Sequence, residues 1–426
     1  MNDDPHPPGS PAALKATAGR ALWLTLLAAC LGWMFDGMQM GIFPLVARPA
    51  LQEMQAASGL LDENFVQLWM GRITALFLIG AAAGGIVFGW LGDRIGRVRA
   101  MTLSILCYSL FSGVGYFAVV PWHLGFTRFL AALGMGGEWA LGVALVMECW
   151  PAKNRSMLGG LIGAAGNLGY ALIAVVGMSA AVTRDSWRWV MLVGTAPALL
   201  ALLIIWFVPE SEQWRAAVGQ ARGRPLREVF GPALRRRTLL AISFSSVALI
   251  VTWGIVQWIP LWADQLTHGG NPRAKATAQL VSAVGSILGC LATPLLGLRM
   301  GQRPLYFWLC LGSLISCLAL FQGCAAYGTL FILAVGLVGF FTGAFYGWLP
   351  QYLPTLFPTR VRATGQGIAY NLGRLLAAAG AWKMGALMAW FDHSYPKAGT
   401  TIALVYLAGM GLIWLAPETR GKPLPE

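Results

Sequence analysis

A chain of 426 residues that is 57% hydrophobic and only 11% charged, with a mean hydropathy of +0.64, is too apolar to be an ordinary soluble domain. Its net charge of +13 could suit a nucleic-acid-binding protein, but about twenty of the thirty lysines and arginines fall in segments expected on one side of a membrane. The composition therefore predicts a polytopic membrane protein with both termini in the cytoplasm, and nucleic acid is not an expected partner.

In chain order, the apolar runs predict twelve transmembrane helices and thus an all-α membrane protein. Each run has about twenty residues or more, the length that a helix rising about 1.5 Å per residue needs to cross a hydrocarbon core of about 30 Å. The predicted spans are residues 21–46, 66–91, 100–119, 121–147, 156–181, 188–208, 237–264, 276–298, 303–323, 328–352, 361–391 and 398–416. Residues 1–20 and 417–426 are expected to be cytoplasmic tails, without a cleavable signal, and the arginine-rich residues 209–236 a cytoplasmic linker loop.

The first span carries Asp36 near its middle, and the fourth carries Arg128 and Glu138. A charged side chain at such depth costs roughly 2.5 to 3.5 kcal/mol on insertion scales, so it needs a partner or a water-filled cavity. We expect Asp36 and Arg128 to pair, either for proton coupling or as a static ion pair that holds two helices together. Because all four histidines lie in the tail or at span ends, carboxylates, including Glu138, are the expected proton carriers.

The loop after the second span reads G-W-L-G-D-R-I-G-R from Gly89 to Arg97. Carboxylates and arginines at helix ends on the cytoplasmic face can latch neighbouring helices through charge-assisted hydrogen bonds. We therefore predict a cytoplasmic gate, to be broken when that side opens, made of Gly89, Asp93, Arg94, Gly96, Arg97, Glu148, Arg155 and Arg362.

A repeat divides the chain into two similar halves. Glu148-Cys149-Trp150-Pro151, Arg155 and Gly160 are echoed by Thr355-Leu356-Phe357-Pro358, Arg362 and Gly367, each 207 residues later. The repeat predicts two six-helix bundles, residues 21–208 and 237–416, with a substrate site between them near the midplane. The second copy of the loop, Gly297 to Arg303, has Leu298 in place of Asp93, so its latch is expected to be weaker.

These motifs resemble those of known transporters. The pattern G-x-x-x-D-R-x-G-R is similar to the signature loop of the major facilitator superfamily. Arg128, Glu148 and Arg155, with Pro209-Glu210-Ser211 and Pro417-Glu418-Thr419-Arg420-Gly421, resemble the sugar porters and related metabolite/proton symporters. The run GGEWALGVALVMECWPAKNR resembles the sialic acid and monocarboxylate proton symporters more closely still.

The resemblance covers nearly the whole chain. It implies the major facilitator fold of twelve helices in two pseudo-symmetric halves, and a coupling pair at the positions of Asp36 and Arg128. One departure is Thr355, where sugar porters carry a glutamate, so the second cytoplasmic charge cluster is incomplete here.

Arg374 lies about a dozen residues into the eleventh span, and the interior of spans seven to twelve holds no acidic residue to neutralise it. A guanidinium binds a carboxylate through two parallel hydrogen bonds, so we predict that Arg374 binds a substrate carboxylate. A comparable arginine in the organic anion transporters of the same superfamily supports this by resemblance, whereas bonding to backbone carbonyls is the alternative. Amide and aromatic residues that could complete the cavity are Gln39, Asn167, Tyr170, Trp253, Gln257, Tyr346, Gln351, Tyr370 and Asn371.

We therefore expect a secondary active transporter that couples protons to the uptake of a small organic anion, such as sialic acid, a sugar acid or a monocarboxylate. A proton-coupled or facilitative transporter of a neutral sugar is an alternative, as is a drug/proton exporter, although the fifth span lacks the Gly-Pro element that resemblance to the antiporters requires. An enzyme is not expected, because the chain has no HExxH, no G-x-S-x-G and no Walker-type phosphate loop.

The remaining expectations follow from the same features. The seven cysteines form no CxxC pair, so neither disulfides nor a metal site are expected, and no cofactor is implied. The expected partners are the substrate, protons and the lipid bilayer, and the expected functional unit is a monomer. The protein should reside in the cell membrane, which is the inner membrane in a Gram-negative bacterium.

Overall fold

The computed structural model describes residues 11–56, 62–150, 155–210, 225–268, 270–358, 361–420 and residue 425. Within these ranges the chain is helical and contains no strand. Ten helical segments in the described ranges are long and apolar enough to cross a membrane. Two further helices, α4 and α15, have 29 residues each and are thus about 43 Å long, which also suffices. The twelve spans expected from the sequence are therefore confirmed.

The elements of the first six spans are α1 (Pro11–Ala56), α2 (Glu63–Ile95), α3 (Arg97–Val114) with the 3₁₀ turn η1 (Gly115–Phe117), α4 (Pro121–Cys149), α5 (Arg155–Ser179), and α6 (Arg188–Val193) followed by α7 (Pro197–Phe207). The short helix α9 (Pro225–Val229) precedes the second half. Helix α1 is ten residues longer at each end than the predicted span 21–46. It continues through Pro44 and Pro49 because this stretch is packed in the core, where Leu45, Val46 and Ala47 are fully buried.

The elements of the last six spans are α10 (Arg235–Gly254), η3 (Val256–Trp258) and α11 (Ile259–Leu266), α12 (Ala274–Met300), α13 (Gln302–Gly323), α14 (Thr329–Tyr352) with η4 (Leu353–Leu356), α15 (Arg362–Trp390), and α16 (Tyr395–Ala403), α17 (Val405–Leu412) and η6 (Ile413–Leu415). Apart from α1, the predicted span boundaries agree with the structure to within a few residues.

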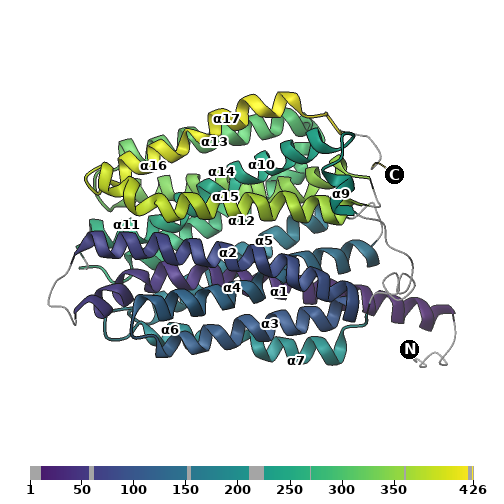
Figure 1. Cartoon of the computed structure of the whole chain (residues 1–426), viewed down its shortest axis with the longest axis horizontal. Coiled ribbons are helices and arrows are strands. Elements are labelled where there is room, and N and C mark those ends of the chain that lie inside the picture. The colour runs from purple at the N-terminus through teal and green to yellow at the C-terminus, as the bar shows by residue number, and fades with distance from the viewer. Residues whose placement is uncertain are drawn as a thin grey trace, which may run out of the picture.

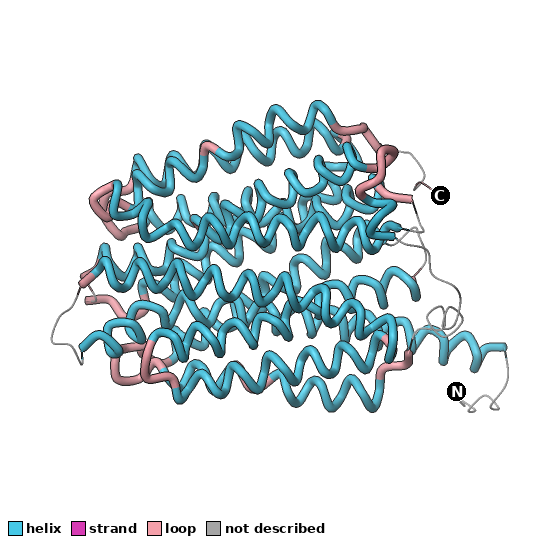
Figure 2. The backbone as a smooth tube through the Cα atoms, viewed as in Figure 1, coloured by secondary structure: helices cyan, strands magenta, loops and turns pink. Residues whose placement is uncertain are grey.

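The helices form two bundles that lie side by side. Figure 1 shows α1 to α7 in one bundle and α10 to α17 in the other, and α1 begins at the same end of the molecule at which α17 finishes. The described connections gather at the two ends of the long helices (Figure 2). Packing of α2 against α15 and of α5 against α12 joins the bundles. The centre of the molecule therefore lies between segments far apart in the sequence.

The two bundles repeat the same close helix packing. In the first, a Cβ atom added to a glycine would collide with the backbone across the α2–α4 contact at three pairs: Gly80 with Phe129, Gly84 with Leu133, and Gly136 with Ala81. In the second bundle, the α12–α14 contact has three equivalent pairs: Gly285 with Gly336, Gly289 with Phe340, and Gly343 with Ser286. The α12 members lie 205 residues after those of α2, and the α14 members 207 residues after those of α4. The halves are therefore pseudo-symmetric residue by residue at this contact, where small residues let helices approach closely.

A carboxylate caps the third long helix of each bundle. Glu210 accepts hydrogen bonds from the backbone N–H groups of Arg97 and Val98 at the start of α3 (2.9 and 3.2 Å), directly after Gly96, whose φ is +108°. Glu418 accepts from the backbone N–H groups of Gln302 and Arg303 at the start of α13 (both 3.0 Å), directly after Gly301, whose φ is +90°. Each carboxylate thus pairs with otherwise unsatisfied N–H donors and with the positive end of a helix dipole.

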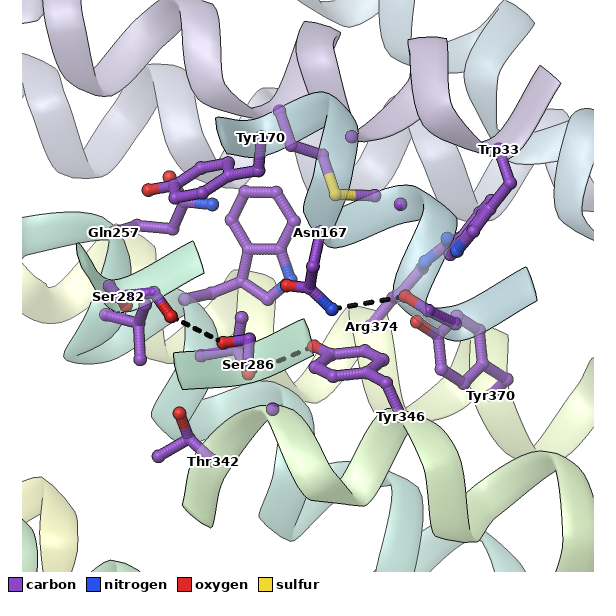
Figure 3. A pocket seen from close by; sticks show the side chains of 18 residues that line it. Trp33, Asn167, Tyr170, Gln257, Ser282, Ser286, Thr342, Tyr346, Tyr370 and Arg374 are labelled. Carbon is purple, nitrogen blue, oxygen red and sulfur yellow. Dashed lines mark hydrogen bonds between the residues drawn. The ribbon is translucent and has the colours of Figure 1, made fainter. Parts of the chain in front are cut away.

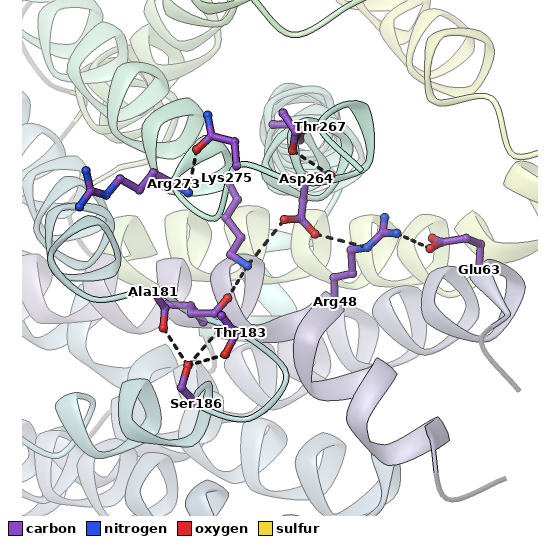
Figure 4. A network of polar contacts seen from close by, with 12 residues as sticks. Arg48, Glu63, Ala181, Thr183, Ser186, Asp264, Thr267, Arg273 and Lys275 are labelled. Atoms are coloured by element: carbon purple, nitrogen blue, oxygen red, sulfur yellow. Dashed lines mark hydrogen bonds and ion pairs between the residues drawn. The ribbon is translucent and has the colours of Figure 1, made fainter. Parts of the chain in front are cut away.

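An ion network joins the two bundles at the end away from Pro11, where α1 finishes and α2 begins (Figure 4). The Arg48 guanidinium of α1 contacts Glu63 of α2 at 2.5 Å and Asp264 of α11 at 3.3 Å. Lys275 of α12 lies 3.7 Å from Asp264 and donates a 2.7 Å hydrogen bond to the Val182 carbonyl of the first bundle. The side chains of Arg48, Asp264 and Lys275 are at most 14% exposed, so solvent screens these contacts weakly.

Candidate substrate-binding site

A pocket lies between the two bundles and is lined from both (Figure 3). Its empty space, including the part that opens to solvent, is about 720 Å³. The first bundle contributes Trp33, Gly37, Met40, Gly163, Gly166, Asn167 and Tyr170 from α1 and α5. The second contributes Thr252, Trp253, Val256, Gln257, Ser282, Ser286, Thr342, Gly343, Tyr346, Tyr370 and Arg374.

Arg374 is the charged residue among those that line the pocket. Its side chain is 2% exposed, and its guanidinium lies 4.7 Å from the centre of the Tyr370 ring. Its Nη1 donates long hydrogen bonds to the Ala81 carbonyl of α2 (3.4 Å) and to Asn371 Oδ1 (3.3 Å), and its Nη2 is buried without a partner. Among the described residues no carboxylate lies within ion-pair distance of this guanidinium. The arrangement leaves donor capacity for an anion.

Seven of the ten residues predicted to bind substrate line this pocket: Arg374, Asn167, Tyr170, Trp253, Gln257, Tyr346 and Tyr370. The other three do not. Gln39 faces Arg128 and Gly194, Asn371 accepts from Arg374 behind the pocket, and Gln351 donates to the Gly347 carbonyl of its own helix. Each of these three uses its amide to pair with a polar neighbour, and residue type alone does not indicate which amides face the pocket.

The expected ion pair between Asp36 and Arg128 is not formed in the described structure. Arg128 instead donates from Nη2 to the Gln39 carbonyl (2.5 Å) and from Nη1 to Gln39 Oε1 (3.3 Å), and it lies over the Phe77 ring. Gln39 in turn donates a 2.7 Å hydrogen bond to the Gly194 carbonyl. Gln39 stands one turn after Asp36 on α1, and it is Gln39 that meets Arg128.

Asp36 and Glu138 lie together in the core of the first bundle. Their side chains are 0% and 1% exposed, and none of their four carboxylate oxygens has a hydrogen-bond partner among the described residues. Asp36 interacts electrostatically with Glu138 and with Arg374. Glu138 packs where a Cβ at Gly32 would stand, one turn before Asp36 on the same face of α1. Asp36 and Glu138 therefore form a buried carboxylate pair, and Arg374 of the pocket acts electrostatically on Asp36.

The predicted gate residues lie at the end of the molecule where α1 begins. Arg94 is exposed, with its guanidinium 4.2 Å from the centre of the Trp90 ring, and Gly96 and Arg97 form the capped start of α3. A Cβ at Gly89 would meet no neighbouring atom. The side chains of Asp93, Glu148, Arg155 and Arg362 lie outside the part of the chain whose side chains the structure describes. The gate stays a prediction.

The sequence did not indicate the hydroxyl-bearing wall of the pocket, which consists of Thr252, Ser282, Ser286 and Thr342, nor did it indicate Trp33. Single serines and threonines in apolar helices are common, and they carry no signal of which face they occupy. The glycine pairs of α12 and α14 could have indicated it. Close approach at Gly339 and Gly343 brings Ser282 and Ser286 of α12 against α14 beside the pocket.

Comparison with known proteins places the chain in a family. Residues 22–381 match the Major Facilitator Superfamily. The chain is 30% identical over 405 residues to a probable 4-methylmuconolactone transporter of Cupriavidus pinatubonensis, covering 93% of this chain and 91% of that protein. It is 26% identical over 398 residues to the sialic acid transporter NanX of Escherichia coli, covering 92% of each.

Among solved structures, the proton:xylose symporter XylE bound to 6-bromo-6-deoxy-D-glucose aligns with a TM-score of 0.75 at 19% identity, covering 95% of this chain and 98% of that one. This likeness concerns the fold alone. With the family match over residues 22–381, it confirms the expected twelve-helix fold. The chain belongs to the major facilitator superfamily and is a multi-pass membrane transporter of small molecules, not an enzyme.

Proposed function

We propose that this protein is a secondary active transporter that takes up a small organic anion together with protons by alternating access. The observation that carries this proposal is Arg374, a buried guanidinium that lines the pocket between the halves with Nη2 unpartnered. A buried charge without a counterion is costly, so an anionic ligand that pairs with it should bind with a charge-assisted gain.

The substrate class follows from that guanidinium. A carboxylate accepts two parallel hydrogen bonds from one guanidinium, whereas a neutral sugar gives no compensating charge. Sialic acid, which the relative NanX is named for, is a carboxylic acid, and this supports a carboxylate substrate. We therefore favour a sugar acid or monocarboxylate over a neutral sugar.

Proton coupling is proposed to use Asp36 and Glu138, with Arg374 as the link to the substrate. Two carboxylates that share a dry site cannot both be ionised, so the pair is suited to hold a proton. A protonated Asp36 would leave Arg374 to the substrate carboxylate, and an ionised Asp36 would compete for it. In this scheme Arg128 holds α1 through Gln39 and does not exchange partners with Asp36.

We further propose that the chain acts as a monomer in the cell membrane with both termini in the cytoplasm. Residues 209–236 are proposed to be the cytoplasmic linker between the two halves. The excess of lysine and arginine in alternate segments supports this orientation. Under it, the Gly89 to Arg97 segment lies on the cytoplasmic side as a gate, and the Arg48 network lies on the opposite side.

The test uses the purified full chain, with binding measured by calorimetry and transport measured in liposomes. Arg374→Ala should weaken binding of a bound carboxylate by at least about tenfold, because hydrogen bonds to charged groups contribute roughly 1.5 to 3 kcal/mol each. Arg374→Lys should restore only part of the affinity, since lysine keeps the charge but loses the fork. Asp36→Asn should abolish accumulation driven by a pH gradient and can leave substrate exchange intact.

Neutral sugars serve as the competing ligands, beside their acid counterparts, in the same assays. If they displace the ligand as well as the acids do, the anion proposal is wrong and a neutral-sugar transporter replaces it. Undiminished proton-driven accumulation by Asp36→Asn would remove Asp36 from the coupling scheme.

A further inference from the structure

We infer that the pocket takes a carboxylate that carries a second hydrogen-bonding group at its far end, and that Tyr170 and Ser282 recognise that second group. This rests on the proposed function, because it takes Arg374 as the partner of the carboxylate. It goes further in naming the shape of the substrate and two residues that select for it.

Three residues that line the pocket each carry a buried polar atom without a hydrogen-bond partner among the described residues: Arg374 Nη2, Tyr170 Oη and Ser282 Oγ. Their residues are 2%, 8% and 3% exposed. Buried polar groups are nearly always paired, because an unpaired one costs roughly 1 to 3 kcal/mol. Polar atoms that line a ligand pocket and lack protein partners are those that a ligand would satisfy.

The neighbouring hydroxyl groups differ, because protein partners already use their protons. Ser286 donates to the carbonyls of Ser282 (3.0 Å) and Gly339 (2.9 Å), and Thr342 donates to Val338 (2.7 Å). Tyr346 donates to Thr252 Oγ1 (3.0 Å). The hydroxyl-bearing wall therefore leaves Ser282, with Tyr170 from the other bundle, as donors free for a ligand.

The unpartnered atoms lie at two ends of the pocket. Figure 3 shows Tyr170 and Ser282, with Gln257, at one end, and Arg374, with Tyr370 and Trp33, at the other. Tyr170 belongs to α5 and Ser282 to α12, so a group bound between them would touch both bundles. A ligand that satisfies both ends must therefore carry two polar groups set apart from each other.

Apolar groups and bare backbone also line the pocket, beside its polar residues. Trp253, Met40 and Val256 contribute apolar surface, and Gly37 and Gly166 have no side chain to offer a hydrogen bond. An aliphatic chain can lie against this part of the lining.

The experiment measures binding of straight-chain acids from butanoate to octanoate, and of the same acids with a terminal hydroxyl, to the purified full chain. At one chain length the hydroxy acid should bind about two- to tenfold more tightly than the plain acid, the gain expected from one or two neutral hydrogen bonds. Tyr170→Phe and Ser282→Ala should each reduce that preference, and the double variant should remove it. In all three variants, the affinity for the plain acid of that length should change less than twofold.

Two matched controls remove buried hydroxyl groups that lie outside the pocket, Tyr306→Phe and Ser313→Ala. Both should keep the preference of the unchanged protein. Thermal unfolding of every variant shows whether it is folded.

The outcomes separate this inference from the proposed function. If no hydroxy acid is preferred at any length, if the double variant keeps the preference, or if it loses affinity equally for both acids, the two-ended substrate is wrong while a carboxylate at Arg374 can stand. If Arg374→Ala binds the plain acids as well as the unchanged protein does, the proposed function itself fails.

Discussion

The contacts of Arg128 change the roles expected for Asp36 and Gln39. The sequence places Asp36 and Arg128 at the depth of a coupling pair, yet the guanidinium bonds to both the carbonyl and the side chain of Gln39. Because Gln39 also donates to Gly194, this chain of contacts ties α1, α4 and the turn after α6 together. Arg128 is therefore suited to hold helices in place, and Asp36 is left to interact with Glu138 and Arg374.

Gln39→Leu tests this assignment. The substitution keeps the size of the side chain but leaves Arg128 Nη1 and the Gly194 carbonyl without their partner, and such a loss costs roughly 1 to 3 kcal/mol. We expect a lower unfolding temperature in detergent, with little change in substrate affinity because Gln39 does not line the pocket. Gln322→Leu, at an exposed position of α13, is the control and should unfold near the original temperature. A tenfold loss of affinity in Gln39→Leu would place Gln39 in the binding site after all.

At the scale of elements, the repeated glutamate caps fix how the third helix of each bundle starts. Burial alone would raise the pKa of Glu418, but hydrogen bonds from the backbone N–H groups of Arg303, Gln302, Arg420 and Thr419 hold that pKa below its usual value. A carboxylate with a lowered folded-state pKa stabilises the fold above its ordinary pKa of about 4.3, and this contribution disappears as the pH falls through the lower value.

Glu418→Gln should therefore lower the unfolding temperature at pH 7, and the difference from the unchanged protein should shrink between about pH 5 and pH 3. Thermal unfolding in detergent across this pH range measures it. Glu210→Gln should also lower the unfolding temperature at pH 7, since Glu210 accepts the equivalent backbone hydrogen bonds at the start of α3. Asp392→Asn, at an exposed position after α15, is the control. An equal effect of Glu418→Gln at both ends of the pH range would show that the charge of the cap is irrelevant.

At the scale of the whole molecule, alternating access requires the two bundles to separate at one end and then at the other. The Arg48, Glu63, Asp264 and Lys275 network ties the bundles at the end away from Pro11, with Asp264 contacted by residues of both bundles (Figure 4). Removing one partner of a buried ion pair typically costs 3 to 5 kcal/mol, because the other charge is left uncompensated. Opening at this end must break the network.

Asp264→Asn should consequently favour the conformation open at this end. We expect greater hydrogen–deuterium exchange in the last turns of α1 and in α11, measured by mass spectrometry on the protein in liposomes. The effects of Arg48→Ala and Asp264→Ala on this exchange should not add when the two substitutions are combined, because the two residues share one interaction.

Glu53→Gln is a matched control for this experiment. It removes an ion pair with Arg188 (2.5 Å) at the same end of the molecule, but both residues belong to the first bundle. Exchange in α11 should therefore stay unchanged in Glu53→Gln. If both variants raise exchange in α11 equally, the network is not a latch between the bundles.

The sequence by itself determined the twelve spans, the repeat of the halves and the presence of charges at membrane depth, because apolar runs and helix lengths are local properties of the chain. It also indicated Arg374 as a pocket residue, since a deep arginine without an acidic residue in the same span is visible in the sequence. Only the tertiary structure decided which polar groups lie together: Gln39 holds Arg128, and Asp36 is buried beside Glu138 without a hydrogen-bond partner among the described residues. It likewise decided that Ser282 lines the pocket and that Arg48 meets Asp264. These contacts depend on how each helix is rotated and packed against segments that lie far away in the sequence, and no local pattern encodes that rotation.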